Sequence, residues 1–263
     1  MREIDCRFVS MFAPGQLFRL RRSPKHVPPA GGAATTVRDK EPYKFFSQSC
    51  FCKARRTKML NLGENAPDFA MGEGKSFHEW RAGRWTLLIS AKALSPTCTV
   101  EFAELARLAG EFSSEDIGLV TLLCDPAQAV TNWLGDLADD FAIHPSWPII
   151  SDSDLSIAAT YGLVDSSGTG LQRASILIDP QGKIAALSAY PITNGRNFSE
   201  MLRIALAARL TATDRVATPP EWTLKNGRVM LPPSLPQSEA EKLYSQGVDI
   251  VRPYLRFVDL PVS

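Results

Sequence analysis

The apolar positions of residues 59–263 follow two spacings that alternate along the chain. Short unbroken apolar runs indicate buried strands, whereas apolar residues that recur every three or four positions indicate the buried face of a helix. The predicted strands are residues 85–90, 117–123 and 148–150, and the predicted helices that follow them are residues 98–112, 127–140 and 154–161. This part of the chain is therefore predicted to form repeated strand–helix units.

A different pattern begins in the following segment. Residues 174–178 and 183–189 are two strand-like runs joined by Asp179-Pro180-Gln181-Gly182, in which proline sets the first central φ and glycine accepts a positive φ. This pattern predicts a β-hairpin, and a helix at residues 198–209 follows it. The complete order predicts an α/β protein with a mixed central sheet flanked by helices, which resembles the thioredoxin-like fold.

Charge and proline content divide the chain into three parts. Residues 1–58 carry 13 Lys/Arg and 4 Asp/Glu, show no sustained helical or strand period, and are predicted to be a basic, disordered N-terminal extension. Residues 59–216 are predicted to form the thioredoxin-like domain, and the proline-rich residues 217–263 a small C-terminal module. The extension lacks the apolar segment of a secretory signal. Two interpretations of it stay open, an arginine-rich transit peptide and translated upstream sequence before a start at Met59.

The composition excludes several classes of protein. No stretch approaches the roughly 18 consecutive apolar residues of a membrane-spanning helix, and a net charge of +1 gives no general attraction to nucleic acid or anionic lipid. Five cysteines, an odd number, argue against a disulfide framework and favour a reducing compartment. We therefore expect a cytoplasmic protein, or a mitochondrial one if the extension is a transit peptide.

No metal site is expected. Cys50-Phe51-Cys52 has no second pair of ligands at a suitable spacing, and neither His78 nor His144 is paired with another histidine. No motif indicates an organic cofactor either, so we expect a protein that works without one.

Cys98 is the strongest candidate for chemistry from its position alone. It lies in the first turn of the predicted helix 98–112, just after Ser95-Pro96, where serine can cap free N–H groups and proline is tolerated. The positive end of a helix favours a thiolate, which is nucleophilic toward disulfides, peroxides or metals. On position alone, a small buried apolar role stays an open alternative.

Several separated motifs resemble the peroxiredoxins of the AhpC/TSA thioredoxin-like superfamily, and the later ones resemble the one-cysteine group in particular. In chain order they are Gly63-Glu64-Asn65-Ala66-Pro67-Asp68-Phe69, Ser95-Pro96-Thr97-Cys98-Thr99-Val100-Glu101, Arg173 with the strand 174–178, Tyr190-Pro191 with Gly195-Arg196-Asn197-Phe198, Val216-Ala217-Thr218-Pro219, and Pro253-Tyr254-Leu255-Arg256-Phe257. The similarity runs from about Leu62 to the end of the chain.

The resemblance implies a thiol-dependent peroxidase that reduces hydrogen peroxide and organic hydroperoxides. Cys98 would attack the peroxide and become a sulfenic acid. Arg173, expected beside it at a surface cleft, would stabilise the thiolate and hold the peroxide, and the Ser95 hydroxyl would bond the substrate. Glu101 would orient an arginine, and Arg196 would support the site. The fixed cations and donors suit a transition state that spreads negative charge.

The resemblance also implies partners. No cysteine follows Cys124, for which we expect a buried packing role, so the sulfenic acid would be resolved by an external thiol such as glutathione or a thioredoxin-like protein. A homodimer is implied as well, with the C-terminal module from about Ala217 reaching onto the partner. The alternative, in which this module folds back on its own domain, stays open.

Three residues beside the site depart from the family's pattern. Ala91 replaces a proline that pins the loop, Ser90 stands where one-cysteine members usually have a histidine, and Lys92 adds a cation. Lost rigidity would slow peroxide reduction, because a misplacement of about 1 Å costs on the order of 100-fold in rate. These departures motivate a second hypothesis, a redox-sensing or interaction protein that kept the fold with weak peroxidase turnover.

Overall fold

The computed structural model describes residues 58–72 and 74–260, and the predictions made for residues 1–57 lie outside this part of the chain. The main-body strands are β1 (Ala70–Gly72), β2 (Lys75–Ser76), β3 (Trp85–Ala91), β4 (Ile117–Leu123), β5 (Ile149–Ser151), β6 (Arg173–Ile178) and β7 (Ile184–Tyr190). The helices are α1 (Phe77–Arg81), α2 (Pro96–Ser114), α3 (Ala127–Phe141), α4 (Ser156–Tyr161) and α5 (Phe198–Thr213). They are followed by β8 (Arg228–Met230), α6 (Gln237–Leu243), β9 (Asp249–Arg252) and β10 (Leu255–Asp259).

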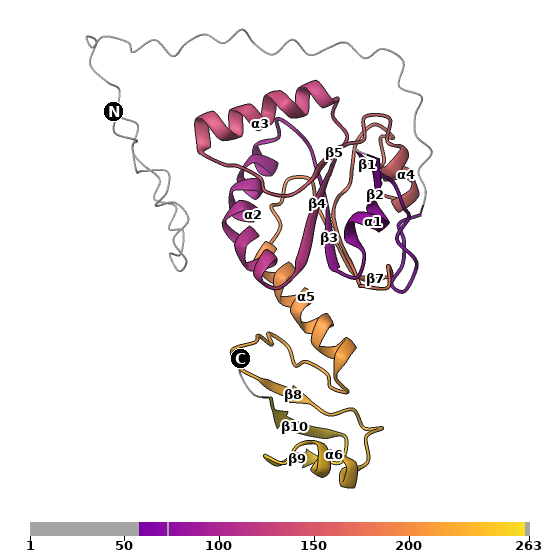
Figure 1. The fold of residues 1–263 in the computed structure, drawn as a ribbon, viewed down its shortest axis with the longest axis vertical. Helices are drawn as coiled ribbons and strands as arrows, with labels where there is room; N and C mark the ends of the chain where they lie inside the picture. Colours follow the sequence, from indigo (N-terminus) through magenta and orange to yellow (C-terminus); the bar gives the residue numbers. More distant parts are fainter. Residues whose placement is uncertain (1–57, 73, 261–263) are drawn as a thin grey trace, which may run out of the picture. The chain divides into compact units, whose positions relative to one another are not determined.

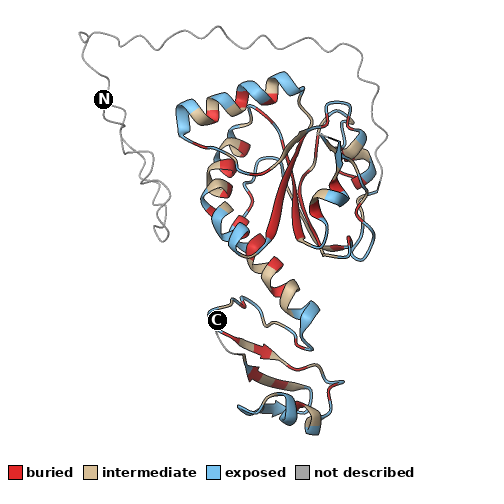
Figure 2. Cartoon of the chain, viewed as in Figure 1, coloured by how far each residue is buried: buried red, intermediate tan, exposed pale blue. Residues whose placement is uncertain are grey.

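A five-stranded mixed sheet forms the centre, in the order β5-β4-β3-β6-β7 (Figure 1). β3 pairs with β4, and β4 with β5, in parallel, whereas β6 pairs with β3 and β7 in antiparallel fashion. Every residue of β3, β4 and β6 is buried (Figure 2). Strands covered on both faces have continuous apolar sequences, which is the pattern that predicted them.

Helices cover both faces of this sheet (Figure 1). On one face, α2, α3 and α5 contribute Phe102, Trp133 and Met201 to a cluster that also contains Cys98. On the other face, α1 and α4 contribute Phe77 and Tyr161 to a second cluster. The predicted α/β architecture with a mixed central sheet is therefore confirmed, and Cys98 lies on the α2 face.

The predicted hairpin between β6 and β7 is also confirmed. The backbone N–H of Asp179 donates to the carbonyl of Lys183 (2.9 Å), and that of Gly182 donates back to Asp179 (2.9 Å). Gly182 has a φ of +86°, the left-handed conformation that glycine adopts without strain. The turn therefore reverses the chain and returns β7 along β6.

The start of α4 differs from the prediction for a local reason. The helix begins at Ser156 rather than near residue 154, because Leu155 has a φ of +61° and is not helical. The buried Asp152 carboxylate accepts hydrogen bonds from Ile157 N (3.0 Å) and Ala158 N (2.8 Å), two of the free donors of the first turn. This side chain caps the helix from outside the usual N-cap position.

Beyond α5, a three-stranded sheet in the order β8-β10-β9 and the short helix α6 form a third apolar cluster. Trp222, Val229 and Val258 are among its buried residues after α5, and Ala207 of α5 is buried in the same cluster. The predicted boundaries 59–216 and 217–263 stay predictions, and α5 is the element that contributes to both the first and the third cluster.

Candidate active site

Cys98 is the third residue of α2 and lies at its N-terminal end. The Ser95 hydroxyl caps the helix by accepting a hydrogen bond from Cys98 N (3.5 Å), and Pro96 occupies the first helical position. α2 therefore begins two residues before the predicted start. The Cys98 side chain is 1% exposed, so its sulfur sits at the positive end of a helix in a largely water-free environment.

The loop that leads into α2 is fixed by contacts that the sequence did not reveal. Ala93 N donates to the Asp125 carboxylate (2.8 Å) at the end of β4. The Thr99 hydroxyl donates to Ser95 O (3.0 Å) and accepts from the indole of Trp133 (3.1 Å) on α3. These bonds join α2 to β4 and α3, so the first turn of the helix has little freedom to move.

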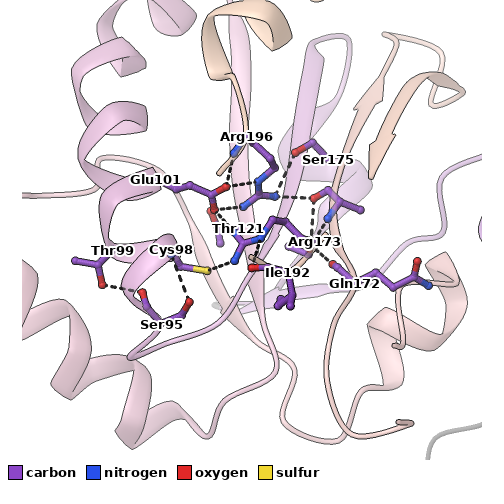
Figure 3. A network of polar contacts seen from close by, with 12 residues as sticks. Ser95, Cys98, Thr99, Glu101, Thr121, Gln172, Arg173, Ser175, Ile192 and Arg196 are labelled. Carbon is purple, nitrogen blue, oxygen red and sulfur yellow. Dashed lines mark hydrogen bonds and ion pairs between the residues drawn. The ribbon is translucent and has the colours of Figure 1, made fainter. Parts of the chain in front are cut away.

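Arg173, the first residue of β6, directs its guanidinium at the sulfur (Figure 3). Its Nη2 lies 3.6 Å from Cys98 Sγ, Nη1 donates to Glu101 (2.5 Å), and Nε donates to Ile192 O (3.2 Å). The residue is only 3% exposed, so the expected place at a surface cleft is wrong. Arg173 is a buried cation, because β6 is covered on both faces and Glu101 supplies a counter-charge.

Glu101 lies one helical turn after Cys98 and joins the two site arginines (Figure 3). Arg196 donates to this carboxylate from its backbone N (2.8 Å), Nε (3.0 Å) and Nη2 (2.7 Å). Burial alone would raise the pKa of Glu101, but the hydrogen bonds and charge of Arg196, together with the charge of Arg173, hold that pKa below its ordinary value. Glu101 is therefore an ionised, structurally central carboxylate at neutral pH.

Arg196 comes from the loop between β7 and α5 and extends the network into β6. Its Nη1 donates to Ala174 O (2.8 Å) and to the Ser175 hydroxyl (3.3 Å). Its guanidinium carbon also lies 5.3 Å from the centroid of the Phe198 ring. Thus the buried arginine holds the start of β6, and with it Arg173, in a fixed position relative to α2.

The structure brings all five predicted site residues together, and their charges nearly cancel. Ser95, Cys98 and Glu101 come from the start of α2, Arg173 from β6, and Arg196 from the loop before α5. Two arginines and one carboxylate leave one positive charge in a buried cluster. A thiolate at Cys98 would neutralise it, and buried charges are tolerated where they are compensated in this way.

Cys124 lies just after β4 and packs against the cluster on the α1 and α4 face, the face opposite Cys98. It is half-buried. Burial, followed by the charge of Asp125, raises the pKa of its thiol to about 11. It is therefore a protonated thiol at neutral pH, in keeping with the expected packing role.

The departures Ala91 and Lys92 differ in their surroundings. Ala91 is the last residue of β3, is buried and pairs with Leu123 of β4. Lys92 is exposed, and its charge acts on Cys124 and Asp125. The sheet itself thus holds the position where the family usually has a proline.

Among residues 58–72 and 74–260, no group of three or more His, Cys, Asp or Glu side chains is arranged to hold a metal ion. His78 and His144 are both exposed there, and the His78 ring bonds Ala66 O (2.7 Å). In the same part of the chain, no helix has the length and apolar character needed to cross a membrane.

The sequence is similar to one family of known proteins over most of its length. The AhpC/TSA family profile matches residues 62–187. Peroxiredoxin-6 of Pongo abelii is 33% identical over 222 residues, which cover 77% of this chain and 98% of that protein. The 1-Cys peroxiredoxin of Dirofilaria immitis is 32% identical over 234 residues, which cover 78% of this chain and 99% of that protein.

Solved structures show the same relationship. The yeast mitochondrial 1-Cys peroxiredoxin has a TM-score of 0.70 and 30% identity, covering 77% of this chain and all of that one. A cysteine-to-serine variant of peroxiredoxin 6 from Arenicola marina has a TM-score of 0.71 and 31% identity, covering 78% of this chain and all of that one. The sheet, the helical layers and the sequence thus agree, and the chain belongs to the peroxiredoxins, thiol-dependent peroxidases with a thioredoxin-like fold.

Proposed function

We propose that Cys98 is the peroxidatic cysteine and that it reduces hydrogen peroxide and organic hydroperoxides. The Cys98 thiolate forms a bond to the terminal peroxide oxygen while the O–O bond breaks. The other oxygen leaves with the electron pair and takes up a proton to become water or an alcohol. The sulfur is thereby oxidised to a sulfenic acid. The observation that carries this proposal is the 3.6 Å contact between Arg173 Nη2 and Cys98 Sγ at a helix start.

The neighbouring residues have separate roles in this proposal. Arg173 stabilises the thiolate and the negative charge that spreads over the peroxide, because its guanidinium is already in place before the reaction. Ser95 retains a hydroxyl hydrogen that can bond a peroxide while its oxygen caps α2. Glu101 and Arg196 hold Arg173 in place through buried ion pairs.

Resolution of the sulfenic acid is assigned to an external thiol. Cys124 packs on the opposite face of the sheet and its thiol is protonated at neutral pH, and no cysteine follows it in the sequence. An outside thiol would attack the sulfenic sulfur, form a mixed disulfide and release water, and a second thiol would reduce that disulfide. Glutathione or a thioredoxin-like protein fits this role, and the yeast mitochondrial 1-Cys peroxiredoxin uses the glutathione and thioredoxin systems for its thiol resolution.

Rapid mixing of the reduced protein with hydrogen peroxide tests the assignment. Samples are quenched at increasing times, and the sulfenic acid is trapped with dimedone and located by peptide mass spectrometry. Cys98 should be oxidised far faster than free cysteine, and the Cys98→Ser variant should give no fast phase. A rate equal to that of free cysteine would contradict the assignment. It would support the redox-sensing alternative, which the peroxiredoxin homologues do not favour.

For assembly, we propose a homodimer in which the module from about Ala217 contacts the partner. This module exposes large apolar side chains: Leu243 is 56% exposed, Ile250 52%, Val251 50% and Tyr254 70%. Sedimentation of a chain carrying Ile250→Asp and Tyr254→Asp should show the monomer mass, whereas Leu62→Asp at another exposed apolar residue should keep the dimer. An unchanged dimer in the double variant would reject the module as the contact.

For location, we propose a reducing compartment, the cytoplasm, or the mitochondrion if residues 1–58 act as a transit peptide. The basic charge of this segment and the odd number of cysteines support the proposal. The full chain and a chain that starts at Met59, each carrying the same C-terminal tag, would be compared by cell fractionation. Mitochondrial recovery of the full chain alone would assign a targeting role to the extension, and equal cytoplasmic recovery of both would reject it.

A further inference from the structure

Ser90 is a buried hydroxyl at the point where the β3–β6 ladder ends. Ile89 and Ser175 form the last main-chain pair between these strands, and Ser90 lies one position beyond it, opposite Ala174. The residue is 1% exposed. A serine side chain contributes little apolar surface to a buried position, so its hydroxyl is the group that distinguishes it there.

The Ser90 hydroxyl makes hydrogen bonds to the main chain on both sides of Arg173, beyond the last main-chain pair of the two strands. Ser90 Oγ accepts a hydrogen bond from Ala174 N (2.8 Å). It also lies within donor distance of Gln172 O (2.5 Å) and Ala174 O (3.1 Å), and its single proton can serve one of them at a time. The two bonded residues are the neighbours of Arg173 in the chain.

Ser90 acts from the face of the sheet opposite Cys98. Side chains alternate between the two faces along a strand. Leu88, two residues before Ser90, belongs to the cluster on the α1 and α4 face, whereas Ile89 and Cys98 belong to the cluster on the α2 face. The hydroxyl therefore influences the sulfur through the backbone of β6.

We propose that Ser90 is a positioning residue for the reaction, which fixes the backbone at Arg173 and so sets the distance between its guanidinium and the Cys98 sulfur. This inference rests on the roles proposed for Cys98 and Arg173. Without the hydroxyl, Ala174 N loses its acceptor, and the start of β6 is no longer bonded to Ser90, although the main-chain pairs from Thr86 to Ile89 remain. A shift of that backbone moves the guanidinium, because the side chain of Arg173 is attached between the two bonded residues.

The first test compares the oxidation rate of Cys98 in Ser90→Ala and Ser90→Thr. We expect the alanine variant to be slowed about tenfold, less than the roughly 100-fold cost of a 1 Å misplacement, because the Gln172 side chain still bonds Gly162 and Val164. Threonine keeps the hydroxyl and suits a strand, so it should retain most of the parent rate. Equal rates for parent and alanine variant would overturn the proposal.

A matched control separates positioning from general stability. Tyr161→Phe also removes a buried hydroxyl that bonds a main-chain carbonyl, that of Pro67 (2.6 Å), and it lies in α4 on the face away from Cys98. This variant should lose stability without losing oxidation rate. If it is slowed as much as Ser90→Ala, the rate follows stability and the positioning role is rejected.

A double-mutant cycle shows whether Ser90 acts through Arg173. In an Arg173→Met background, Ser90→Ala should cause no further slowing, whereas an additional tenfold loss would mean that Ser90 acts by another route. If Arg173→Met alone keeps the parent rate, the role of Arg173 fails and the active-site assignment must change.

If Ser90→Ala is too unstable for kinetics, its crystal structure decides. Lengthening of the Nη2–Sγ distance is expected, and an unchanged distance would overturn the proposal.

Discussion

Replacing Arg173 by methionine removes the cation that contacts the Cys98 sulfur while keeping a side chain of similar length. Glu101 does not lose all its partners, because Arg196 still donates to it from three nitrogen atoms. In the variant, Arg196 alone must balance both Glu101 and the Cys98 thiolate. The buried cluster then carries a net negative charge when the thiolate forms, so the reactive species is disfavoured.

The expected loss of oxidation rate in Arg173→Met follows from the distance between the two charges. Arg173 Nη2 lies 3.6 Å from Cys98 Sγ, and two unit charges at this separation interact by about 4.6 kcal/mol at an effective dielectric constant of about 20. A difference of about 1.4 kcal/mol corresponds to a factor of ten, so complete loss would slow the reaction by roughly a thousandfold. Arg196 and rearranged solvent compensate in part. We therefore expect slowing on the order of 100-fold.

The assay is single-turnover oxidation of Cys98 by hydrogen peroxide, followed by rapid quenching and dimedone trapping. Arg107→Met is the control, since Arg107 lies on the same helix but its side chain is 53% exposed and pairs with Glu104 at the surface. Such pairs contribute little energy, so this variant should match the parent. A folded Arg173→Met protein whose rate stays within threefold of the parent would refute the reasoning.

Three further predictions concern the surroundings of the sulfur. Because the pKa of Glu101 is lowered by folding, its stabilising contribution is complete above about pH 4.3, the ordinary value, and is lost as pH falls through the lower folded value. The free energy of unfolding should therefore fall steeply in acid for the parent and less steeply for Glu101→Gln; equal slopes would contradict this. Cys124→Ser should leave the rate of Cys98 oxidation unchanged, measured by the same trapping assay, and a large loss would reopen Cys124 as a reacting group. Trp133→Phe should lower stability by about 1 kcal/mol in denaturant unfolding, as one hydrogen bond to Thr99 is lost; an unchanged stability would show that this bond is not needed.

The sequence predicts the architecture well where burial and periodicity act together. β3, β4 and β6 are buried on both faces, and their continuous apolar runs mark them directly. The N-cap Ser95 followed by Pro96 places Cys98 at a helix start from local chemistry alone. The predicted start of α4, near residue 154, differs from the observed start at Ser156. The Asp152 cap and the left-handed Leu155 do not change the spacing of apolar residues, so the sequence pattern does not reveal them.

The site is predicted less completely, for a physical reason. The motifs identify its five residues, but burial is a property of the assembled layers, so Arg173 was expected at a surface cleft and is instead enclosed. Contacts such as Asp125 with Ala93 join an acidic residue after one strand to the loop after another. The donors in these contacts are backbone N–H groups. Every residue except proline has one, so the residue type does not predict which of them will bond.

The ion-pair network has a consequence for the newly made chain. Cys98 meets its cation 75 residues later in the sequence, and Glu101 meets Arg196 95 residues later. Contacts of such long range form only when the intervening chain is present and folded, and they are slow to form. A ribosome-bound or half-folded chain therefore lacks the contact between Arg173 and Cys98 on which the proposed mechanism depends. The arrangement of Cys98, Glu101, Arg173 and Arg196 is complete only when the sheet is complete, so the proposed chemistry would belong to the folded protein alone.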